Sequence, residues 1–339
     1  EGGATNMAEA YGKVTGLPGI AMVTRGPGAC NGSIGVHTAM QDSTPMVIFI
    51  GQVARDQEYR EAFQEVDYRQ FYGALCKWVG QIESADRIPE MVSKAFHHAM
   101  SGRPGPVALA LPEDMLRDLT NVEDAGAYKI ARPGADPTDI ERMMDMLKGA
   151  AKPLMIVGGG GWTPEACDDI RAFAQANNLP TAASFRCQDI MDNNLSCYVG
   201  ELGTSVSAAL KARVQESDLL LVVGARLGEM TTGGYSMVSV PRPRQTLIHV
   251  YPDPDEMGRV YQPDLPFCAG VDRFAAAARR ASAGDNARWA GWLDSARADY
   301  LANLKPTAGL PGAVDMARVI DDIQSRVGET AIIVSDAGN

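Results

Sequence analysis

Short apolar segments alternate with stretches of helical periodicity along the chain. The apolar segments are rich in Val, Ile and Leu, and each predicts a strand buried on both faces, as in a parallel sheet. They cover residues 20–24, 46–51, 107–111, 154–157, 219–223, 246–251 and 331–335. The helical stretches cover residues 85–101, 139–147, 164–176, 205–214, 273–281 and 313–326. This alternation predicts an α/β protein with successive doubly wound parallel sheets.

Two stretches of low apolar periodicity divide the chain. The first is rich in Asn, Asp, Gly, Arg and Pro, and the second holds Trp289 and Trp292 on a predicted helix before a Pro-Gly turn. We predict a first domain at 1–120, a linker at 121–138, a second domain at 139–281, a linker at 282–312 and the start of a third domain at 313–339. The chain begins without Met and ends after a predicted strand whose faces need further elements to cover them. We therefore expect a fragment that lacks sequence at both ends.

Composition excludes several classes of protein. The net charge of −11 argues against a nucleic-acid partner and against docking on an anionic membrane surface. No apolar segment approaches the roughly 20 residues that a membrane-spanning helix needs. The 6 cysteines form no CxxC pair, so neither a zinc site nor a disulfide framework is expected. We expect a cytoplasmic protein.

Two glycine-rich segments follow predicted strands and precede predicted helices. The first, GPGACN at 26–31, has glycines that permit a tight turn and close backbone approach, and it opens a helix whose N-terminus carries partial positive charge. An ordinary strand-to-helix turn explains it equally well. The second, GGGG at 158–161, is placed like a dinucleotide site but lacks GxGxxG spacing, so a turn that binds nothing is favoured. Arg226 follows another predicted strand, where it would contact a phosphate or pair with Glu229.

A series of motifs resembles the pyrimidine-binding domain of thiamine diphosphate enzymes, in the family's order. They are EGGA at 1–4, VTRGPGACN at 23–31, MQDSTPM at 40–46, GQV at 51–53, AFQEVD at 62–67 and SGRPGPV at 101–107. Residues 139–275 resemble the family's central domain, and residues 313–339 resemble the opening of its diphosphate domain. The chain is most similar to acetolactate synthase large subunits.

The resemblance implies roles for particular residues. Glu1 matches the catalytic glutamate, which hydrogen-bonds N1′ of the cofactor's aminopyrimidine. Gly26, Pro27, Gly28 and Asn31 match positions that line this ring. Gln64 and Lys77 match positions at the active-site entrance, between subunits of a homodimer or homotetramer. Thiamine diphosphate is the implied cofactor, with Mg²⁺ held by the missing third domain and no metal ligand expected in this chain.

The implied reaction is decarboxylation of a small-molecule 2-keto acid, with carboligation of the remaining acyl unit to a second carbonyl. The GPG loop has no histidine, which favours carboligation over simple decarboxylation. Another thiamine diphosphate-dependent decarboxylase, oxidase or lyase is the alternative within enzymes. A non-catalytic nucleotide-binding or scaffold module is the alternative outside them, although a scaffold has no need of the Glu1 carboxylate.

The chain departs from the family at several positions. Flavin-binding members carry Gly-Met-His-Gly where this chain reads GELGT at 200–204, Arg where it has Gly73, and Arg-Phe-Asp where it reads RLG at 226–228. These departures argue against bound FAD. Arg25 replaces a small hydroxyl residue, and it either binds a substrate carboxylate or forms an exposed ion pair.

Overall fold

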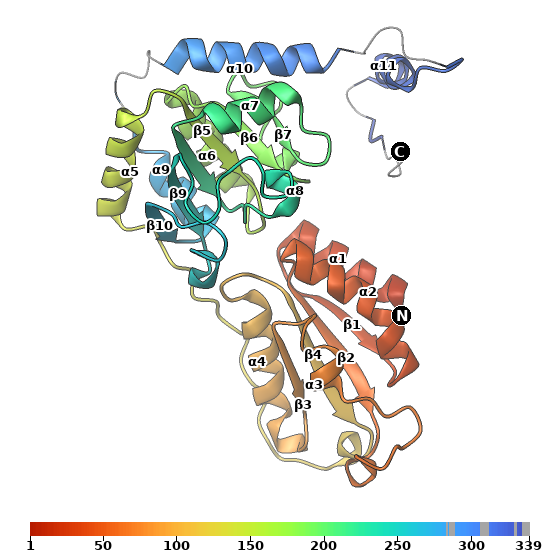
Figure 1. The fold of residues 1–339 in the computed structure, drawn as a ribbon. Helices are drawn as coiled ribbons and strands as arrows, with labels where there is room; N and C mark the ends of the chain where they lie inside the picture. The colour runs from red at the N-terminus through yellow and green to blue at the C-terminus, as the bar shows by residue number, and fades with distance from the viewer. Residues whose placement is uncertain (283, 285–288, 306–311, 329–330, 334–339) are drawn as a thin grey trace.

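The structure is a computed structural model that describes residues 1–282, 284, 289–305, 312–328 and 331–333. It contains a 4-stranded sheet and a 6-stranded sheet, each flanked by helices (Figure 1). Every strand pairing in both sheets is parallel. The predicted fold class, α/β with successive parallel sheets, is therefore confirmed.

The first sheet has the strand order β1-β2-β4-β3. Its strands are β1 (Gly19–Val23), β2 (Met46–Gln52), β3 (Trp78–Gln81) and β4 (Pro106–Pro112). Its helices are α1 (Gly2–Thr15), α2 (Pro27–Asp42), α3 (Tyr68–Phe71) and α4 (Ile88–Met100). Neighbouring β2 side chains point to opposite faces, so Ile48 packs with Val36 of α2, whereas Val47 packs with Ala95 of α4.

The second sheet has the strand order β10-β9-β8-β5-β6-β7. Its strands are β5 (Pro153–Val157), β6 (Thr181–Ser184), β7 (Tyr198–Leu202), β8 (Leu219–Val223), β9 (Thr246–Tyr251) and β10 (Leu265–Cys268). Its helices are α5 (Pro137–Gly149), α6 (Pro164–Ala176), α7 (Ala208–Glu216), α8 (Glu229–Thr232) and α9 (Val271–Ala278). The strand order reverses between β5 and β8, which is the point where open α/β sheets bind ligands.

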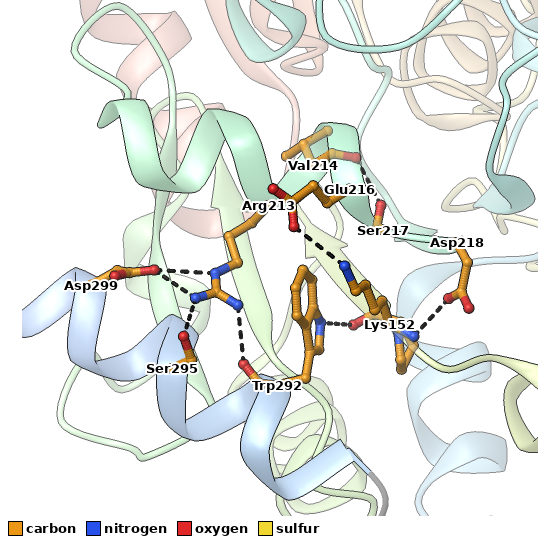
Figure 2. A network of polar contacts seen from close by, with 10 residues as sticks. Lys152, Arg213, Val214, Glu216, Ser217, Asp218, Trp292, Ser295 and Asp299 are labelled. Atoms are coloured by element: carbon orange, nitrogen blue, oxygen red, sulfur yellow. Dashed lines mark hydrogen bonds and ion pairs between the residues drawn. The ribbon is translucent and has the colours of Figure 1, made fainter.

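Helix α10 (Ala290–Asn303) lies within 282–312, the stretch predicted to be a linker. It packs on α7 and β7, and its Leu293 and Ala296 join the core of the second sheet. Figure 2 shows the polar contacts that hold it, in which Arg213 of α7 reaches Asp299 and lies over the ring of Trp292. Residues 290–303 are therefore a packed helix and not a linker, because their apolar side chains are buried against the second sheet.

The predicted strands up to residue 251 are confirmed within one residue at each end. The prediction that all of them are buried on both faces is wrong for β1, where Ile20 is 54% exposed and Met22 is 72% exposed. The last predicted strand, 331–335, has no strand at 331–333, and its remaining residues lie outside the described ones. Helix α11 (Met316–Val327) precedes it and has no buried residue. Within the described residues, we find no helix with the length and apolar character needed to cross a membrane.

Candidate functional site

A stripe of glycines on α2 sets the position of α1. Gly28, Gly32 and Gly35 are spaced so that they share one side of the helix, and this side faces α1. A Cβ at Gly32 would lie 3.3 Å from Cγ2 of Thr5, a residue that is fully buried between the two helices. The absence of side chains along this stripe brings the two helix axes close together. As a result, the start of α1 lies beside the first turn of α2.

Glu1 lies at this junction as the N-cap residue of α1. Its Oε2 accepts a long hydrogen bond of 3.4 Å from Nδ2 of Asn31. A Cβ at Gly28 would lie 3.5 Å from both Cγ and Oε1 of Glu1. Glu1 and Asn31 are both exposed, so their polar groups share one open surface beside a residue without a side chain. This is an arrangement that can hold a carboxylate against a planar ring.

The turn before α2 brings a further predicted residue to the same place. Gly26 has φ of 56°, a conformation that favours glycine, and Pro27 is the first helical residue after it. A Cβ at Gly26 would lie 2.7 Å from Cβ of Gln64, so the Gln64 loop packs directly on this turn. The structure thus places six of the predicted residues close together: Glu1, Gly26, Pro27, Gly28, Asn31 and Gln64.

Two other residues that the sequence analysis singled out have local partners. The Nζ of Lys77 donates to the Ser101 carbonyl at 2.5 Å, and burial lowers the pKa of this lysine to about 8. Arg25 forms an ion pair with Glu113 at 2.7 Å, across the end of the first sheet. The structure therefore agrees with the ion-pair interpretation of Arg25.

The Gly158–161 segment forms a turn that packs on a second turn. A Cβ at Gly159 would lie 2.0 Å from the carbonyl oxygen of Gly224, so the ends of β5 and β8 are in direct backbone contact. The indole Nε1 of Trp162 donates to the Gly158 carbonyl at 2.9 Å. These contacts require glycine at Gly159 because the two turns pack backbone against backbone.

Two arginines lie at the C-terminus of α2, where the first sheet's part of the chain meets the second's. Arg226 reaches it from the second part, and the backbone N–H of Arg103 in the first part donates to Asp253 Oδ2 at 3.0 Å. Within the described residues Arg226 forms no ion pair with Glu229, and its Nη2 instead donates to the Gln41 carbonyl at 2.8 Å. Arg103 donates through Nε to Ser43 Oγ at 2.9 Å, and its Nη2 donates to the Met40 carbonyl. The sequence carried no signal for these contacts, because the partners lie 60 or more residues apart.

No group of three or more His, Cys, Asp or Glu residues within the described part of the chain could hold a metal ion. The site therefore consists of an exposed carboxylate, an exposed amide and the exposed Pro27 ring over the buried Gly26 and Gly28, next to a loop that carries Gln64. Such a set can orient a neutral ring and hold a proton at one of its nitrogens. It cannot bind a divalent cation without further ligands.

Family models match two parts of the chain. Residues 1–71 match the thiamine pyrophosphate enzyme N-terminal TPP-binding domain, and residues 140–278 match the thiamine pyrophosphate enzyme central domain. The first match includes every residue of the site described above. The chain belongs to the thiamine pyrophosphate enzyme family.

Curated relatives agree with this assignment. The acetolactate synthase large subunit of Corynebacterium glutamicum is 29% identical over 350 residues, which cover 100% of this chain and 55% of that protein. The acetolactate synthase isozyme 2 large subunit of Escherichia coli is 34% identical over 269 residues, which cover 77% of this chain and 47% of that protein. The chain spans about half the length of the curated relatives it matches.

Proposed function

We propose that the protein decarboxylates a small-molecule 2-keto acid and joins the remaining acyl unit to a second carbonyl compound, as an acetolactate-synthase-like enzyme. The observation that carries this proposal is the Glu1 carboxylate, held beside Gly28 and Asn31 at the first turn of α2. The similarity to acetolactate synthase large subunits supports this reaction over others of the family.

The residues present fit the aminopyrimidine half of thiamine diphosphate. The absence of a side chain at Gly28 leaves room for the Glu1 side chain itself. Glu1, Pro27 and Asn31 are exposed beside it, so a ring that lies on this surface would be within reach of the carboxylate. In this proposal Glu1 would hold a proton at N1′ of the ring, Asn31 orients the carboxylate, and the turn at Gly26 and Pro27 would line the ring. When bound, the cofactor supplies the carbanion chemistry that the side chains of proteins lack.

The diphosphate and its Mg²⁺ need ligands that this site lacks. We propose that a diphosphate-binding domain supplies them, and that residues 313–339 belong to its start. We further propose a cytoplasmic homodimer or homotetramer, with Glu1, Pro27 and Gln64 near the subunit interface. Obligate interfaces of this kind bury more than about 2,000 Å².

We also propose that the protein works without FAD. Arg226, which lies at the end of β8, has its Nη2 bound to the Gln41 carbonyl. At position 73, where flavin-binding members carry arginine, this chain has glycine.

The test is product analysis with the protein that carries this chain together with a diphosphate-binding domain. The protein is incubated with thiamine diphosphate, Mg²⁺ and a panel of 2-keto acids, and carbon dioxide and hydroxy-keto acid products are measured. Carboligation products support the proposal. Carbon dioxide with free aldehyde would indicate a decarboxylase, and cofactor binding without turnover would indicate a scaffold.

A further inference from the structure

Two buried tyrosines, Tyr68 and Tyr72, form hydrogen bonds to the backbone at the start of α2. The backbone N–H of Gly26 donates to Oη of Tyr68 at 2.8 Å, and this hydroxyl donates to the Gly51 carbonyl at 3.2 Å. The hydroxyl of Tyr72 donates to the Ala29 carbonyl at 2.6 Å. Tyr68 is 3% exposed and Tyr72 is fully buried.

These hydrogen bonds lie on both sides of the backbone that faces Glu1. Gly26 precedes Pro27 and Gly28, and Ala29 follows them, so the two phenols hold the chain at either end of this dipeptide. Tyr68 also connects the turn to the end of β2 through Gly51. The turn is thereby fixed relative to the sheet and not only to its own helix.

The tyrosines come from the same loop region as Gln64. Asp67 begins α3 by accepting hydrogen bonds from the backbone of Arg69 and Gln70, and Tyr68 is the first residue of this helix. Nε2 of Gln52, which is 4% exposed, donates to the Val66 carbonyl at 2.9 Å and anchors the loop to β2. The segment that packs Gln64 on Gly26 therefore also carries the residues that hold Gly26.

We infer that Tyr68 and Tyr72 are positioning residues, whose hydroxyls fix the Gly26–Ala29 backbone against which the cofactor ring would lie. The catalytic consequence of this inference rests on the proposed function. The structural part does not, because it concerns the backbone of this chain alone.

Packing by itself does not account for these hydroxyls. A buried hydroxyl costs free energy unless it is hydrogen-bonded, and phenylalanine would fill either space without that cost. Burial raises the pKa of both phenols, so both are neutral donors at physiological pH. Both hydroxyls bond to backbone atoms of one turn, which is the pattern expected of groups that hold it in place.

The first experiment measures amide hydrogen exchange in this chain for Tyr68→Phe and Tyr72→Phe. The matched control is Tyr198→Phe, which removes a buried phenol hydroxyl from β7. We expect the amides of Gly26 and of residues 28–31 to exchange about 10-fold faster or more in Tyr68→Phe, with the second domain unchanged. An unchanged rate at 26–31, or an equal rise throughout the first domain, would overturn the inference. If Tyr68→Phe fails to fold, the same comparison in Tyr72→Phe decides.

The second experiment uses the protein that carries this chain and a diphosphate-binding domain. Proton exchange at C2 of thiamine diphosphate is measured at saturating cofactor, together with cofactor affinity. We expect C2 exchange to fall about 10-fold in Tyr68→Phe, because a displaced ring meets Glu1 in the wrong geometry. Tyr198→Phe should keep the wild-type rate.

Wild-type protein without C2 exchange would contradict the proposed function alone, while the amide exchange still decides the positioning role. Faster amide exchange with unchanged C2 exchange would limit the tyrosines to a structural role and overturn the inference.

Discussion

A Cβ at Gly35 of α2 would lie 2.5 Å from both the carbonyl carbon and Oγ1 of Thr5 in α1. No side chain fits in this contact, so position 35 sets how closely the two helices approach. Because Glu1 is the N-cap of α1 and Gly26 is the N-cap of α2, this approach also sets where the carboxylate lies relative to the glycine turn. The geometry of the site thus depends on a glycine remote from it.

Gly35→Ala is therefore expected to lower the free energy of unfolding. Overpacking against backbone costs about 1–3 kcal/mol and replacing glycine in a helix returns about 1 kcal/mol, so a net loss of up to about 2 kcal/mol is expected. Gly3→Ala is the matched control, because nothing lies within 4 Å of a Cβ there, and it should be neutral or slightly stabilising. Urea denaturation of both variants measures the difference. Equal stability of the two would show that the helices do not need this contact.

Glu1→Gln is expected to keep the fold and lose most of the proposed activity. An amide cannot share a proton with N1′ as a carboxyl group can, and general acid–base contributions are worth about 10²–10⁴-fold in rate. Stability should change by less than about 1 kcal/mol, the value of a charge at a helix N-terminus. Glu9→Gln, farther along α1, is the control. Measurement of C2 proton exchange with bound cofactor checks the prediction, and equal rates in wild type and Glu1→Gln would remove Glu1 from the mechanism.

Strands with a continuous run of apolar residues could be predicted from the sequence alone. Those strands are continuous apolar segments, such as Leu219–Val223. The strands it missed include Trp78–Gln81, Thr181–Ser184 and Leu265–Cys268, which have four residues each and only modest apolar character. Their hydrogen bonds come from neighbouring strands, and tertiary context overrides such weak local preference.

The residues of the candidate site likewise fall into those that a local motif reveals and those that only long-range contacts reveal. Glu1 and the Gly26–Asn31 motif are recognisable because their order and spacing are local. The hydroxyl of Tyr72 meets Ala29 across 43 positions of sequence, and Arg226 meets Gln41 across 185. No periodicity connects such pairs, so only the folded chain places them together.

The purified protein is expected to show no stoichiometric flavin absorbance in the visible range. The reason is that the Arg226 guanidinium donates to the Gln41 carbonyl at the C-terminal end of α2, and that position 73 is a glycine and so carries no positive charge. Absorption spectra of the protein as isolated, and again after incubation with FAD and gel filtration, test this expectation. A yellow protein that keeps one flavin per chain would contradict it.

Lys77 should make stability depend on pH in the alkaline range. Burial lowers the pKa of this lysine from 10.5 to about 8, so between these values the unfolded chain binds more protons than the folded one. The free energy of unfolding contributed by this group therefore rises with pH through that window, by about 1–3 kcal/mol, and is lowest below it. Lys77→Met should remove this rise, whereas Lys148→Met, at a half-exposed lysine of α5, should keep it. Urea denaturation across pH measures both slopes, and a wild-type slope in Lys77→Met would show that another group is responsible.

Arg213 and Trp292 should be energetically coupled, because α10 is held to the elements of the second sheet through them (Figure 2). The Arg213 guanidinium lies 4.5 Å from the centre of the Trp292 ring, and the indole Nε1 donates to the Pro153 carbonyl at 3.0 Å. A cation over tryptophan contributes about 0.5–2 kcal/mol and a hydrogen bond about 0.5–1.5 kcal/mol. We expect Trp292→Leu to cost about 1–3 kcal/mol, and a double-mutant cycle with Arg213→Met to give a coupling energy of about 0.5 kcal/mol or more. Asp294→Ala, an exposed change on the same helix, should be close to neutral. Additive effects of Arg213→Met and Trp292→Leu would mean that the ring and the guanidinium stabilise α10 independently.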